Sequence, residues 1–140
     1  MYQHQVQYYE TDRMGITHHS NYVRWMEEAR VSFLAEHQYG YDRLEEEGIV
    51  SPVLSVSCEY KKTTTFAQTI DIAVEVKSFN GVKLVLEYVM KREDEVVCVG
   101  ESRHCFLNKE GRPLRMKKEY PAFYEMLKKE ETCRENSGNI

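Results

Sequence analysis

Residues 8–30, YYETDRMGITHHSNYVRWMEEAR, join two segments whose apolar residues recur with different periods. From Tyr2 to Tyr8, aromatic, histidine and valine side chains alternate with glutamines, and this period of two predicts a strand with one buried face. From Tyr22 to about Gln38, apolar residues recur at helical spacing. The polar residues between these segments therefore lie where a strand leads into a long helix.

Four further segments have a period of two and are predicted to be strands, at residues 54–60, 70–76, 82–90 and about 95–107. Asn80-Gly81 separates the middle pair, and this dipeptide favours the positive φ angles of a type I′ hairpin turn. Glu93-Asp94 predicts the next reversal. The strands at 70–76 and 82–90 are therefore expected to be antiparallel neighbours, and all four strands are expected to be antiparallel.

This order of elements predicts an α+β fold in which an antiparallel sheet wraps around one long central helix. The sheet face away from that helix is also expected to be rich in apolar residues, namely Val53, Ala73, Val85, Val89, Val96 and Cys98. Solvent disfavours such a surface, so we expect a dimer or tetramer interface to cover it.

The chain has 140 residues, which is the size of one globular domain. We assign that domain to residues 1–128, including a short helix from about Pro121, and expect residues 129–140 to form a polar tail. The net charge of -4 argues against nucleic acid or anionic lipid as a partner. The four cysteines include no C-x-x-C pair, and no leader or membrane-spanning segment is evident, so we expect reduced thiols in a cytoplasmic protein.

The strand-to-helix junction contains the groups that acyl transfer requires. A helix that begins near His19 or Ser20 has unpaired N–H groups and the positive end of its dipole at its first turn. If Asp12 faces that turn across a pocket, a carboxylate and oxyanion donors are brought together, and Gly15 permits a close approach of the backbone. The competing interpretation is that Asp12 and Thr17 are ordinary loop and capping residues.

The junction resembles the signature of hotdog-fold acyl-CoA thioesterases of the 4-hydroxybenzoyl-CoA thioesterase type, including the Tol-Pal-associated branch. In that signature a strand is followed by an aspartate, a glycine three residues later, and an aromatic residue or histidine before an x-N-Y at the helix start. Five residues match in order and spacing: Asp12, Gly15, His19, Asn21 and Tyr22. With lower specificity, EYKKTTTFAQTIDIAVEV and LNKEGRP extend the likeness over about residues 2–127.

The resemblance implies hydrolysis of an acyl-CoA thioester, with Asp12 as nucleophile or as general base toward water. It implies that the backbone N–H of His19 holds the thioester oxygen and that Gly15 and Asn21 shape the turn and the helix entry. Asn21, Tyr22 and Thr63 are carried over as residues that line the substrate site. In this family the pocket lies between two protomers, so a homodimer or homotetramer is expected, with CoA as part of the substrate and no metal or redox cofactor.

Two departures from the family pattern bear on substrate choice. Arg13 and Met14 stand where small residues or proline are frequent, and TTTFAQ, residues 63–68, lacks the proline and acidic residues of many relatives. Both segments border the acyl or pantetheine channel in the family. Just before the second one, Lys61 and Lys62 are candidates for binding the CoA phosphates, as are Arg92 and Arg112, although a solvated basic edge explains them equally well.

Several alternatives stay open at this point. Glu10 could be a second catalytic acid, but strand alternation predicts an exposed carboxylate. His18 and His19 could join Asp12 in a metal site, but adjacent histidines are expected to point in different directions and H-x-x-x-H spacing is missing. Other functions on the same fold are hydrolysis of acyl-acyl carrier protein, dehydration or hydration of acyl thioesters, and acyl binding without catalysis.

Overall fold

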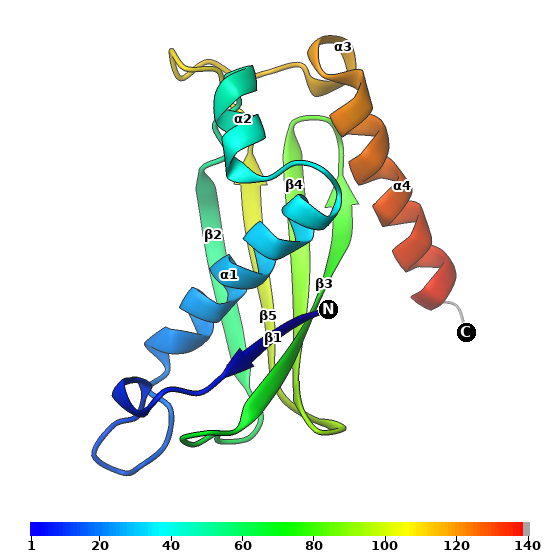
Figure 1. The fold of residues 1–140 in the computed structure, drawn as a ribbon. Coiled ribbons are helices and arrows are strands. Elements are labelled where there is room, and N and C mark those ends of the chain that lie inside the picture. Colours follow the sequence, from blue (N-terminus) through cyan, green and yellow to red (C-terminus); the bar gives the residue numbers. More distant parts are fainter. Residues whose placement is uncertain (139–140) are drawn as a thin grey trace.

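A five-stranded antiparallel sheet curls around helix α1 (Ser20–Glu36) in the computed structural model, which describes residues 1–138 and their side chains as far as Arg134 (Figure 1). The strands are β1 (Tyr2–Gln5), β2 (Val53–Tyr60), β3 (Thr69–Phe79), β4 (Lys83–Arg92) and β5 (Glu95–Cys105). Their order across the sheet is β1-β3-β4-β5-β2, so β1 and β2 form the two edges. The expected α+β fold, with one long helix inside the sheet, is confirmed.

The apolar stripe of α1 explains why this helix lies against the sheet. Trp25, Met26, Ala29 and Phe33 are buried, and each large side chain removed from water contributes about 1.5–3 kcal/mol. The helix ends at Glu36, two residues before the predicted end. The sheet residues buried in the same core include Ile70, Ile72, Leu84, Leu86, Tyr88 and Met90.

Three other helices lie around this unit: α2 (Tyr41–Glu47), α3 (Met116–Glu119) and α4 (Pro121–Gly138). Helix α4 packs against β3, and Glu130 of α4 pairs with His37 at the end of α1, 3.0 Å from Oε1 to Nε2. The helix predicted from Pro121 is thus longer than expected and continues through most of the predicted polar tail. The last two residues of that tail, 139–140, lie outside the described residues.

The first strand is shorter than the alternating pattern predicted. It ends at Gln5, and a 3-10 turn, η1 (Tyr8–Glu10), follows. Because this turn rotates the chain, Tyr8 is exposed rather than on the buried face.

The predicted hairpins are present, but two details of the sheet differ. β3 and β4 pair antiparallel around Asn80-Gly81, and only Gly81 has a positive φ (91°), so the turn is not type I′. Cys98 pairs with Met90 and is fully buried on the face toward α1, not on the outer face. One member of the predicted outer apolar set therefore belongs to the core.

Candidate active site

A cleft of about 290 Å³ lies between the start of α1 and the residues that follow β2. Its lining residues are Asp12, Ile16, Thr17, His19, Tyr22, Tyr60, Lys61, Lys62 and Thr63. The structure therefore brings together all of the predicted site residues except Gly15 and Asn21. The catalytic and binding roles of these residues stay predictions.

The loop that carries Asp12 is closed on itself. Asp12 N–H donates to the carbonyl of Ile16 at 2.8 Å, and Gly15 N–H donates to the carbonyl of Asp12 at 3.0 Å. Gly15 has φ +78°, a conformation that disfavours side chains, and so it shapes this turn without lining the cleft. The Asp12 carboxylate accepts a bond from Met14 N–H through Oδ1, whereas Oδ2 has no hydrogen-bond partner among residues 1–138. One carboxylate oxygen is thus fixed and the other is available in the cleft.

The start of α1 leaves one backbone donor unused. His18 N–H donates to the carbonyl of Glu10 at 2.9 Å, and Ser20 N–H donates to His18 Nδ1 at 3.2 Å. Between them, His19 N–H makes no hydrogen bond to any described residue. The side-chain amide of Asn21 donates to the carbonyls of Glu10 and His18, which ties the helix start to the preceding segment. Because the positive end of the helix dipole lies here, the His19 N–H is a suitable donor for an oxyanion.

Glu10 is buried, and the prediction that it is an exposed carboxylate is wrong. The 3-10 turn directs it inward, where it accepts bonds from Trp25 Nε1 and from Gln7 N–H, each at 2.8 Å, and lies 2.8 Å from His4 Nε2. Burial alone would raise the pKa of Glu10, but these hydrogen bonds and the nearby His4 outweigh burial and lower the pKa. Glu10 therefore holds β1, the 3-10 turn and α1 together through its hydrogen bonds, and it does not line the cleft.

A chain of hydroxyl groups forms the inner wall of the cleft. Tyr22 Oη lies 2.9 Å from Thr64 Oγ1, which lies 2.6 Å from Thr17 Oγ1. Burial raises the pKa of Tyr22, so its phenol stays protonated at neutral pH. At the mouth, Tyr60 Oη donates to the carbonyl of His19 at 3.3 Å. Thr64 is buried, whereas the sequence analysis had predicted Thr63 as the site residue. Because both positions are threonine, nothing in the sequence distinguished them.

The basic candidates divide between the two ends of the molecule. Lys61 and Lys62 line the cleft, and Lys61 Nζ pairs with Glu59 at 2.9 Å. Arg92 instead holds the loop after β2, because it donates to the carbonyl of Thr63 at 2.6 Å and pairs with Glu95. Arg112 belongs to the loop between β5 and α3, which lies at the opposite end of the sheet from the start of α1 (Figure 1), and it does not line the cleft.

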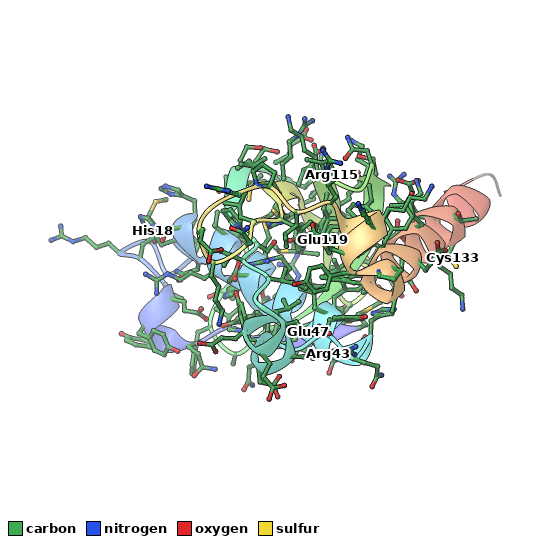
Figure 2. All side chains as sticks on the ribbon, turned by 90° about the horizontal axis from the view of Figure 1, so that it is seen from above. His18, Arg43, Glu47, Arg115, Glu119 and Cys133 are labelled. Carbon is green, nitrogen blue, oxygen red and sulfur yellow. The ribbon has the colours of Figure 1, made fainter. Side chains whose placement is uncertain are left out.

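The two adjacent histidines stack on each other, with ring centroids 4.3 Å apart, so the expectation that they point in different directions is wrong. His18 lies at the opposite side of the molecule from Cys133 of α4 (Figure 2). The side chain of His18 lies 2.9 Å from Ser20 Oγ through Nδ1. Within the part of the chain that the structure describes, no group of three or more potential ligands gathers around a possible metal position.

Comparison with known proteins identifies the family. Residues 6–130 match the sequence profile of the thioesterase-like superfamily. The chain belongs to this superfamily. The prediction of a thioesterase-like fold is thereby confirmed at the level of the superfamily.

Related thioesterases agree with this assignment. YneP of Bacillus subtilis (strain 168), whose name describes an acyl-CoA thioesterase, is 32% identical over 130 residues, covering 89% of this chain and 94% of YneP. Acyl-CoA thioester hydrolase YbgC of Escherichia coli O157:H7 is 29% identical over 101 residues, covering 67% of this chain and 75% of YbgC. A crystal structure of the DHNA-CoA thioesterase from Staphylococcus aureus superposes with a TM-score of 0.88 at 25% identity, covering 99% of this chain and 94% of that one. This thioesterase-like protein is therefore a hotdog-fold thioester hydrolase.

None of its helices within residues 1–138 has the length and apolar character needed to cross a membrane.

Proposed function

We propose that this protein hydrolyses acyl-CoA thioesters and that Asp12 and the His19 backbone N–H carry the reaction. The observation that supports this proposal most directly is that one cleft is lined by both residues, with a carboxylate oxygen and a backbone N–H that bond to no described residue. The names of YneP and YbgC support the choice of acyl-CoA as substrate. We also propose the narrower assignment to the 4-hydroxybenzoyl-CoA thioesterase type and its Tol-Pal-associated branch.

The proposed mechanism uses groups of the protein alone. The thioester oxygen accepts a bond from His19 N–H, which stabilises the negative charge that develops when the carbonyl carbon is attacked. Asp12 either attacks that carbon, with water releasing the acyl group later, or takes a proton from the attacking water. In both cases the C–S bond breaks, the thiolate leaves and is protonated, and the products are a carboxylic acid and CoA. The reaction needs no metal or redox cofactor.

Lys61 and Lys62 favour CoA over an acyl carrier protein as the carrier. Both residues line the cleft, and their ammonium groups would attract a nucleotide phosphate. We propose a cytoplasmic location, which agrees with the four free cysteines at positions 58, 98, 105 and 133.

The edge strand β2 supports a dimer as the minimal active unit. Val53, Val56 and Tyr60 are each about half exposed along this edge, although a lone edge strand with apolar side chains is prone to pair with another chain. We propose that β2 pairs with the same strand of a second copy, which would enclose the adjacent cleft. Two such dimers would form the homotetramer that the family resemblance implies.

The test is a thiol-release assay over a panel of acyl-CoA thioesters. Asp12→Asn should lower kcat by at least about 100-fold while fold and oligomer are kept, because the variant lacks the charge that attacks or activates water. Asp42→Asn, at the far end of the molecule in α2, is the matched control and should keep full activity (Figure 1). Turnover by Asp12→Asn close to that of the unmodified protein would refute the role of Asp12.

A second substitution separates the backbone of His19 from its side chain. His19→Ala preserves the backbone N–H, so its kcat should fall far less than that of Asp12→Asn. An equally large loss would show that the imidazole takes part directly. Circular dichroism of both variants should show unchanged helix content.

A further inference from the structure

The Asp12 loop and the start of α1 meet at one residue, Glu10. The loop is closed at its base by a bridge between Thr11 and Thr17. Just outside this bridge, the carbonyl of Glu10 accepts a bond from His18 N–H at 2.9 Å. Glu10 therefore lies where the chain leaves toward Asp12 and where it returns to α1. The mechanism proposed above assigns no role to this residue.

The direction of the His19 N–H depends on the peptide group to which it belongs. That group joins His18 to His19, and its carbonyl accepts two bonds from Asn21, one from the backbone N–H at 3.0 Å and one from the side-chain amide at 3.3 Å. In a planar trans peptide the carbonyl and the N–H point in opposite directions. The two bonds therefore hold the His19 N–H pointing away from Asn21.

The backbone of Glu10 fixes the same peptide group from its other end. Besides the His18 N–H, the Glu10 carbonyl accepts a bond from the side-chain amide of Asn21 at 2.9 Å. The Asn21 amide thus bridges the carbonyls of Glu10 and His18. A displacement of Glu10 would move the His18 N–H and the Asn21 amide together, and with them the proposed oxyanion donor.

The side chain of Glu10 anchors this carbonyl to the rest of the fold. Its carboxylate lies 2.8 Å from His4 Nε2 of β1 and accepts bonds from Gln7 N–H and from Trp25 Nε1–H of α1, each at 2.8 Å. Burial raises the pKa of Glu10, but these hydrogen bonds outweigh burial and lower the pKa. The carboxylate is therefore ionised at neutral pH, and its bonds are charge-assisted. Through Trp25 the side chain is held by the body of α1, while the carbonyl holds the first turn of the same helix.

We propose that Glu10 is a positioning residue of the thioesterase, which directs the His19 N–H toward the thioester oxygen and holds the Asp12 loop against the start of α1. Glu10 acts through its carbonyl and its anchored side chain, since it is buried and lies outside the lining of the cleft. This inference rests on the proposed acyl-CoA hydrolysis and adds to it a residue that the proposed mechanism does not use.

The first test is Glu10→Gln in the thiol-release assay over the same panel of acyl-CoA thioesters. Glutamine keeps the size of the side chain, but its NH₂ group meets the indole N–H of Trp25, so the anchor to α1 is lost. Because a displaced donor no longer matches the developing charge, kcat should fall about 10- to 100-fold while KM changes less than about two-fold. The loss should be similar for every substrate, since all of them share the thioester carbonyl.

Glu28→Gln is the matched control for this comparison. Glu28 lies on the other side of His4, 3.2 Å from Nδ1, and its replacement also removes a carboxylate from that histidine. This variant should keep the kcat and the KM of the unmodified protein.

A binding measurement separates positioning from a purely structural role. A decanoyl-CoA analogue with CH₂ in place of the thioester sulfur keeps the carbonyl that the His19 N–H would bind, whereas S-decyl-CoA lacks it. Glu10→Gln should weaken binding of the ketone about ten-fold, the value of one hydrogen bond, and leave the Kd of the thioether within about two-fold. Calorimetric titration measures both, at a temperature where circular dichroism shows the variant to be folded. Equal weakening of both analogues, or of neither, would overturn the positioning role.

A second variant keeps the proposal testable if Glu10→Gln does not fold. Trp25→Phe keeps an aromatic ring in the core but removes the N–H that is bonded to Glu10 Oε2. Its kcat should fall with little change in KM, and an unchanged kcat would contradict the proposal.

The possible failures are distinguishable. An unchanged kcat in folded Glu10→Gln would overturn the positioning role and leave acyl-CoA hydrolysis standing. If the unmodified protein hydrolyses no acyl-CoA of the panel, the proposed function fails, and the positioning role of Glu10 fails with it.

Discussion

Replacement of Glu10 by glutamine tests how the strand-to-helix junction is held. Glu10 accepts three hydrogen bonds at 2.8 Å in a buried position. If the glutamine oxygen takes the place of Oε1, its NH₂ group meets Trp25 Nε1–H, so two donors face each other and one charge-assisted bond is lost. Such a bond contributes about 1.5–3 kcal/mol, and the unpaired donor costs about 1–3 kcal/mol more. We expect Glu10→Gln to lower the free energy of unfolding by about 3 kcal/mol at neutral pH.

The lowered pKa of Glu10 determines how this loss of stability changes with pH. The pKa of Glu10 is lowered in the folded protein from its ordinary value of 4.5. The stabilisation is therefore fully present above pH 4.5 and is lost as the pH falls through the lower folded value. Because glutamine does not titrate, the difference in stability between the unmodified protein and Glu10→Gln should shrink over this acidic range.

Urea unfolding, followed by circular dichroism at several pH values, measures both quantities. Glu28→Gln is the matched control, because Glu28 contacts the other nitrogen of His4, 3.2 Å from Nδ1, but is partly exposed. This variant should lose less than about 1 kcal/mol. The reasoning would be refuted if Glu10→Gln were as stable as the unmodified protein at neutral pH, or if its deficit stayed constant into the acidic range.

Three further predictions concern the backbone and the loops. Gly15→Ala should cost about 1–2 kcal/mol in urea unfolding because φ is +78° there, and an unchanged midpoint would contradict this turn geometry. Gly100→Ala should cost about 1–3 kcal/mol in thermal unfolding, because the new Cβ would lie 2.8 Å from Met26 Sδ; a stabilised variant would show that Met26 moves aside freely. Arg92→Met should raise KM about five-fold with little change in kcat, since the loop at Thr63 loses its 2.6 Å hydrogen bond; steady-state kinetics that show only a kcat effect would argue against this role.

Local patterns in the sequence predicted most of the sheet because strand periodicity and turn residues act over short distances. The period-two segments around Asn80-Gly81 and Glu93-Asp94 became β3, β4 and β5 in antiparallel register. The Asp12 loop and the start of α1 were also found, because the order and spacing of a few residues identify them. The turn type at Asn80 was missed, since the same dipeptide fits more than one hairpin loop.

What escaped prediction depends on how the chain turns over a few residues. The 3-10 turn at Tyr8–Glu10 interrupts the alternation, and with it the assignment of Glu10 to an exposed face. The sequence could have predicted that the buried residues Ser102 and His104 share a strand face, because they follow Cys98 and Gly100 at a period of two. Which face that is depends on the pairing of β5 with β4, a long-range contact that no local pattern specifies.

Trp25 is the single tryptophan of the chain, and its place in the core makes it a natural optical probe. Its indole is fully buried, bonded to Glu10, and 4.8 Å from the ring of Tyr22, which lines the cleft. Because the chain has no second indole, emission excited selectively at tryptophan originates beside the strand-to-helix junction that carries Asp12. A change in emission on adding a thioester analogue would report occupation of the cleft without any label, and the same signal would follow the loss of the junction during unfolding.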